Sequence, residues 1–129
     1  MKCNEIYEAA LSHIGVVPYS EGSEEYEKLA PYLLCAVCYE MSNTDKEYRI
    51  AKGEAQAKAW DGLSLPLSAD FPLSPRFSSA AAFCLASSLV ASTNDKLADE
   101  FYMRYNQSMN KIVGEIQATV TGTRNVYPE

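Results

Sequence analysis

The chain is poor in the residues from which most catalytic and phosphate-binding sites are built. It has one histidine, and its six glycines are isolated from one another. A single histidine restricts histidine-based catalysis, and isolated glycines do not form a Gly-rich phosphate loop. No nucleophile-elbow sequence is present either. The residue chemistry therefore favours an interaction protein over an enzyme, and we assign no catalytic, cofactor-binding or metal-binding residue.

Long apolar segments are also missing. No run approaches the roughly 18 residues of a membrane-spanning helix, and no apolar signal region follows the N-terminus. The chain has 129 residues, a net charge of −6 and a pI near 4.8. An acidic balance argues against a protein that grips nucleic acid or anionic membrane by its overall charge. We expect one soluble, non-secreted domain that makes no contact with membrane.

Cysteine is sparse as well, but two of the four cysteines form a C-x-x-C, Cys35 and Cys38. A redox pair needs its first thiolate at a helix N-terminus, and a structural zinc site needs four ligands. Here the pair stands inside an apolar helical run, and Cys3, Cys84 and the single histidine are scattered. The pattern predicts that both thiols belong to the core. A metal or redox role remains the alternative.

Apolar residues recur mostly at steps of three and four, so the sequence predicts an all-α fold of about four to five helices. Ser42 to Asp45 indicates a break with a new helix cap, and Ser74-Pro75 indicates another helix start. The stripe of the last helix is expected to pack against the helix before it, with Gly122 as its latest end. The expected elements are helices at about 4–13, 23–41, 46–60, 75–92 and 95–120, an irregular proline-containing loop at about 61–75, and an extended tail at 121–129.

The block Phe71-Pro72-Leu73-Ser74-Pro75-Arg76-Phe77 leads into a small-residue helix, and a long helix with Phe101, Tyr105 and Met109 on its stripe follows. This order resembles the head–tail adaptor (connector, or head completion) proteins of tailed double-stranded DNA phages. Those proteins are small helical bundles in which a proline-marked loop precedes an Ala-rich helix and a long amphipathic helix. The start of the chain, Ile6 to Gly15, is similar to the short first helix of that family.

The resemblance implies a protein that is not an enzyme. Residues 1–120 would form the adaptor domain, and the tail at 121–129 would reach a neighbour or the portal. The subunits would form a homo-oligomeric ring below the portal, contact a downstream neck or tail protein, and let DNA pass through the lumen. In isolation we expect a monomer or small oligomer. The protein would lie in the virion, and in the host cytoplasm before assembly.

Apolar and aromatic residues at the edges of the helices are the candidate contacts with partners. Tyrosine and tryptophan combine an apolar body with a polar tip and are favoured at interfaces. The candidate partner-binding residues are Val120, Val126, Tyr127 and Trp60. A small helical regulatory or ligand-binding module, with a pocket between its helices, is the other alternative function.

Overall fold

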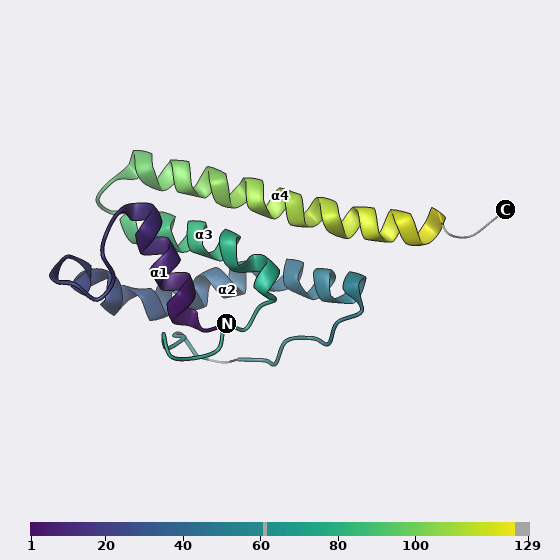
Figure 1. Ribbon diagram of the computed structural model, residues 1–129, viewed down its shortest axis with the longest axis horizontal. Coiled ribbons are helices and arrows are strands. Elements are labelled where there is room, and N and C mark those ends of the chain that lie inside the picture. The colour runs from purple at the N-terminus through teal and green to yellow at the C-terminus, as the bar shows by residue number, and fades with distance from the viewer. Residues whose placement is uncertain (61, 126–129) are drawn as a thin grey trace.

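The computed structural model describes residues 1–60 and 62–125 and confirms a small all-α fold. Figure 1 shows the long helix α4 above the others and an irregular segment below α2. The helices are α1 (Cys3–Ile14), α2 (Glu24–Lys52), α3 (Ser78–Val90) and α4 (Asp95–Asn125), with short 3₁₀ turns η1 (Glu21–Ser23) and η2 (Pro75–Phe77).

Helix α3 is the centre of the bundle, and it packs against α1, α2 and α4. A helix that is apolar on most sides is a buried helix, and nine of the thirteen residues of α3 are buried. Small side chains at Ala81 and Ala86 let neighbouring helices approach closely. The sequence prediction that the last two helices form the core is confirmed, since Phe101, Tyr105 and Ile112 of α4 are buried.

Helix α2 differs from the sequence prediction in two ways. It continues without interruption through residues 42–45, where a break was expected, and it ends at Lys52 rather than near Trp60. Gly53 has a left-handed backbone with φ of 69°, and its N–H and that of Glu54 cap the last carbonyl groups of the helix. Glycine adopts this conformation at little cost, so it ends the helix. The irregular segment therefore begins at residue 53.

The side chain of Asp45 explains why the expected cap is absent. Asp45 is buried, and its Oδ1 accepts a hydrogen bond of 2.8 Å from the backbone N–H of Ser74. Its Oδ2 accepts one of 2.9 Å from Nε of Arg49. The carboxylate therefore links α2 to Ser74, the residue just before η2, instead of capping a new helix. Ser74 accepts from Arg76 N at 3.4 Å, as the expected Ser74-Pro75 cap requires.

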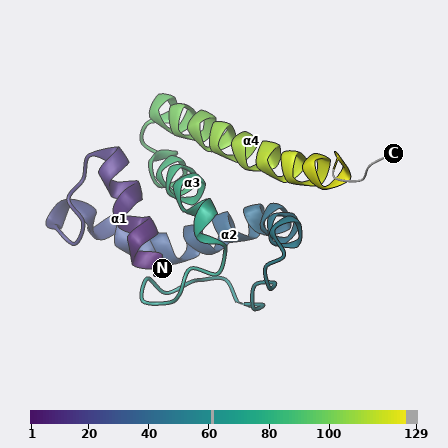
Figure 2. The ribbon, with the colours of Figure 1, turned by 45° about the vertical axis from the view of Figure 1, so that its right-hand side comes forward.

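The C-terminal end of the last helix also differs from the sequence prediction. Helix α4 passes through Gly122 and ends at Asn125, so residues 121–125 are helical rather than part of an extended tail. At about 1.5 Å per residue, the 31 residues of α4 span about 46 Å and the 13 residues of α3 about 20 Å. The far end of α4 therefore projects past its packing partner, as Figure 2 also shows. The expected tail residues 126–129 lie outside the described residues.

Replacing Asp45 with alanine should destabilise the fold by about 3–5 kcal/mol, because Arg49 and the Ser74 N–H would lose a buried acceptor. Urea unfolding monitored by circular dichroism measures this loss. Glu47→Ala, an exposed carboxylate on the same helix, is the control and should change the free energy of unfolding by less than about 0.5 kcal/mol. Equal effects of both substitutions would contradict the role given to Asp45.

Phe101→Ala should cost about 3–5 kcal/mol, because the ring is buried between α3 and α4. Met103→Ala, on the same helix but exposed, should cost less than about 0.5 kcal/mol. Thermal and chemical unfolding of the two variants provides the comparison. A loss below about 1 kcal/mol for Phe101→Ala would mean that this face of α4 is not part of the core.

Candidate partner-binding site

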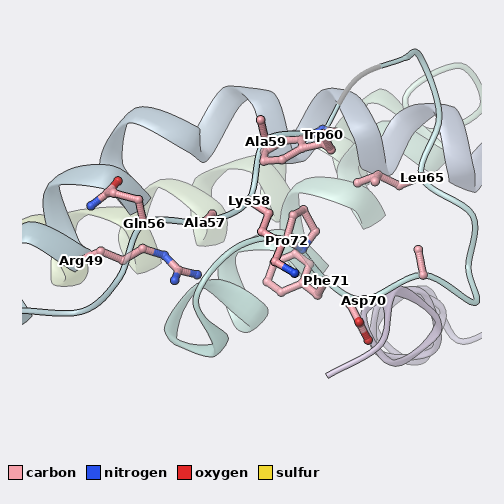
Figure 3. Close-up of a pocket in the computed structure, with 11 residues that line it drawn as sticks. Arg49, Gln56, Ala57, Lys58, Ala59, Trp60, Leu65, Asp70, Phe71 and Pro72 are labelled. Atoms are coloured by element: carbon pink, nitrogen blue, oxygen red, sulfur yellow. The ribbon is translucent and has the colours of Figure 1, made fainter.

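An open groove of about 470 Å³ lies beneath α2, between two extended parts of the irregular segment. Figure 3 shows residues 56–60 along one side and residues 70–72 along the other. We call it the Trp60 groove. It falls within the roughly 300–1,000 Å³ typical of binding pockets. Its lining residues are Arg49, Gln56, Ala57, Lys58, Ala59, Trp60, Leu65, Ala69, Asp70, Phe71 and Pro72.

The first wall of the groove is held against α2 by three contacts. Arg49 donates from Nη1 to the carbonyl of Ala55 at 2.9 Å, which turns the chain back after Gly53. The Trp60 ring stacks on Tyr39 with centroids 5.0 Å apart. The Tyr39 hydroxyl also donates to the carbonyl of Trp60 at 3.3 Å. These contacts place the predicted partner-binding residue Trp60 partly buried, at the edge of an accessible groove.

The second wall is joined to the N-terminus of the chain. The N–H groups of Cys3 and Asn4 donate to the carbonyls of Ala69 and Leu67, both at 2.8 Å. These bonds satisfy N–H groups that the first turn of α1 leaves without a helical partner. Phe71 N donates to the carbonyl of Met1 at 2.9 Å, and Lys2 pairs with Asp70 at 2.7 Å. The wall is therefore fixed by backbone bonds, and the exposed ion pair adds little.

The groove is apolar with a basic edge. Trp60, Leu65, Phe71 and Pro72 supply apolar area, while Arg49 and Lys58 supply positive charge. The Nε of Arg49 is engaged by Asp45. The hydrogen bond from Lys2, together with its charge, lowers the pKa of Asp70, so this carboxylate stays ionised. Trp60 Nε1 is enclosed and has no acceptor among the described atoms. It is therefore not exposed to the groove.

A second uncovered surface lies on the far part of α4. Val113 and Val120 are 37% and 41% exposed, and Ile116 between them is partly buried. Glu115 of α4 forms a bidentate ion pair with Arg76 of η2, with N–O distances of 2.7 and 2.9 Å. This pair joins α4 to η2. The hydrogen bond with Arg76 lowers the pKa of Glu115. Val120 thus lies where α4 leaves the bundle, while Val126 and Tyr127 lie outside the described residues.

The outer face of α2 carries a third set of exposed apolar residues that the sequence analysis did not identify as a site. Leu29 is 48% exposed, and Tyr32 is 60% exposed. They lie on the opposite side of the helix from the buried residues Ala30, Leu34 and Val37. Leu63, from the irregular segment, is also exposed. The helical spacing could have revealed this second face, because residues 29, 32, 36 and 39 follow steps of three and four.

The C-x-x-C is part of the core, as the sequence predicted. Cys35 and Cys38 are buried in the middle of α2, and Cys3 and Cys84 are also buried. Burial raises the pKa of Cys3 to about 11 and that of Cys84 to about 12, and it raises the pKa of Cys38 as well. Thiols in this state are poor nucleophiles at neutral pH. In the described part of the chain, no three His, Cys, Asp or Glu residues are placed to hold a metal ion.

His13 is exposed on α1, but its ring stacks on Phe83 with centroids 4.3 Å apart. Burial and the charge of Arg104 lower its pKa. The imidazole therefore remains neutral at pH 7. His13 lines a smaller groove of about 260 Å³ between α1 and α3. Among the residues that line this groove, Glu5 is the one other side chain suited to acid–base chemistry.

Neither the protein-family models, nor the curated proteins, nor the solved structures gave a significant match to this chain. Within the described residues, no helix is both long enough and apolar enough to cross a membrane. The proposed function therefore rests on the residues and surfaces of the chain itself.

The double variant Cys35→Ala, Cys38→Ala should keep its fold and lose about 1–3 kcal/mol of stability through truncation in the core. In the native protein at pH 8, a thiol reagent should react slowly with Cys3, Cys38 and Cys84, because their raised pKa values keep these buried thiols protonated. The unfolded protein is the control and should react rapidly at all four cysteines. Stoichiometric zinc in protein purified without added metal would contradict this structural role.

Proposed function

We propose that this chain is a subunit of a phage or prophage head–tail connector, which forms a ring below the portal through which DNA passes. The observation that carries the proposal is the far end of α4, which projects beyond α3 and carries the exposed Val120, with Val113 exposed earlier on the same face. A single copy leaves this apolar face without a partner. Exposed apolar surface of this kind is typical of a chain that completes its packing in an assembly.

The order of elements supports the same function. A proline-marked segment leads through Ser74-Pro75 into the small-residue helix α3, and the long amphipathic helix α4 follows. This is the order that led to the resemblance to connector proteins. The net charge of −6 is compatible with a lumen along which DNA slides without binding. The partners in this proposal are further copies of the chain, the portal, and a neck or tail protein.

A second candidate function is a small helical ligand-binding module. The Trp60 groove favours it, because apolar walls and a basic edge are features of sites for small anionic ligands. The redox alternative is less well supported, since the buried thiols have raised pKa values.

Val120→Asp should leave the fold intact and prevent incorporation into the connector. Val120 is partly exposed near the end of α4, so its replacement should change stability by less than about 0.5 kcal/mol. Binding to portal-bearing heads from the same phage, measured by co-sedimentation, should fall at least about tenfold, which corresponds to about 1.4 kcal/mol.

Ala118→Asp is the matched control, because it adds the same charge to an exposed position on a different face of the same helical turn. It should bind portal-bearing heads as the unmodified chain does. Electron microscopy of the bound heads should show a ring below the portal. If the unmodified chain does not associate with such heads, the connector proposal is wrong.

A further inference from the structure

We infer that the Trp60 groove receives residues 126–129, Val-Tyr-Pro-Glu, of a second copy of this chain. The inference deepens the proposed function, because it specifies one contact by which neighbouring subunits would associate. It is carried by the position of the groove, its chemical character and the direction of α4.

The direction of α4 makes a second copy the occupant. The irregular segment that lines the groove lies below α2, and α4 lies above α2, in both views (Figures 1 and 2). Lys52, at the end of α2, is 3.4 Å from the hydroxyl of Thr119, and α4 then continues through six more residues. Those six residues extend α4 by about 9 Å, and four more can span at most about 14 Å. The described end of α4 therefore lies on the other side of α2 from the irregular segment that bears the groove of the same chain.

The residues of the segment match the groove in kind. Val126 and Tyr127 are suited to apolar walls made by Trp60, Phe71 and Pro72. Tyrosine adds contact area with little loss of side-chain freedom, which favours it at interfaces.

Charge favours the same occupant. Glu129 ends the segment, and Lys58 stands at the rim of the groove, exposed and without an ion pair among the described residues. Asp70 also lines the groove and pairs with Lys2 at 2.7 Å, and the charge of Lys58 makes a smaller contribution to lowering its pKa. Lys58 is therefore the available cation for a carboxylate that enters.

The backbone of the first wall is also available. Residues 55–60 belong to no helix or strand, and none of their N–H groups donates a hydrogen bond to a described residue. An extended segment can pair with such an edge and gain main-chain hydrogen bonds in addition to side-chain contacts. The resulting contact joins two different surfaces, so its repetition produces a ring if the rotation closes and an open chain if it does not.

Trp60 is the only tryptophan of the chain, so its fluorescence reports directly on the groove. We would titrate full-length protein with a synthetic peptide of residues 119–129, which contains tyrosine but no tryptophan. The expected result is a saturable blue shift of Trp60 emission. A peptide with Val126→Ala and Tyr127→Ala should produce no shift, and a scrambled peptide tests for non-specific binding.

Charge exchange identifies the contact of Lys58 with Glu129. Lys58→Glu should weaken binding of the unmodified peptide by up to about fivefold, as expected for a partly exposed ion pair, and a Glu129→Lys peptide should restore it. Lys96→Glu, exposed at the start of α4, is the matched control and should leave binding unchanged. Sedimentation of the full chain should show self-association that rises with concentration, and removal of residues 126–129 should abolish it.

An unchanged emission at millimolar peptide, or equal binding of the scrambled peptide, would overturn the inference. So would self-association that persists without residues 126–129, since another surface would then join the copies. These outcomes are separable from the proposed function. If the peptide binds as expected but the protein does not associate with portal-bearing heads, only the connector proposal fails. If the heads are bound normally without residues 126–129, only this inference fails.

Discussion

The buried carboxylate of Asp45 is the interaction on which the rest of the structure depends. It accepts from the backbone of Ser74, 29 residues away, and from Arg49, which in turn donates to the carbonyl of Ala55. These bonds fix the end of α2, the first wall of the Trp60 groove and the start of η2. A buried carboxylate is tolerated only when it is paired and hydrogen-bonded. The same two partners that satisfy Asp45 therefore also determine how the chain passes from α2 to α3.

Helix α3 lies at the centre of the bundle and is much shorter than α4, so part of α4 extends past it. Three helices pack around a short helix rich in alanine, and its 13 residues cannot cover the whole length of α2 or α4, which have 29 and 31 residues. The irregular segment covers part of the remaining surface of α2, through hydrogen bonds with Tyr39 and with the carbonyl of Pro31. Helix α4 is covered as far as the pair of Arg76 with Glu115 and the contact of Lys52 with Thr119. Beyond that point Val120 is 41% exposed.

The sequence predicted features that depend on periodicity and local chemistry. The buried stripe of Phe101 and Tyr105, the Ser74-Pro75 helix start and the burial of Cys35 and Cys38 are of this kind. The predicted break at residues 42–45 was wrong. The local sequence suggests that Asp45 caps a new helix, but in the fold its carboxylate accepts hydrogen bonds from Ser74 and Arg49 instead. The helix through Trp60 was wrong because one left-handed glycine, Gly53, outweighs the weak helical preference of the alanines and lysines after it. The groove itself could not be predicted, because it joins residues from three separate parts of the chain.

The basic edge of the groove has a local cause despite the net charge of −6. Helix α2 begins with Glu24, Glu25 and Glu27 and ends with Arg49 and Lys52, an arrangement that complements the helix dipole. The chain turns back at Gly53, so the basic end of the helix becomes one end of the groove. Net charge therefore describes how the whole molecule behaves at long range, where salt screens it beyond about 8–10 Å. At contact distance the local groups matter: Arg49 pairs with Asp45, whereas Lys58 has no ion pair among the described residues, so the groove has a cation at its edge even in an acidic protein.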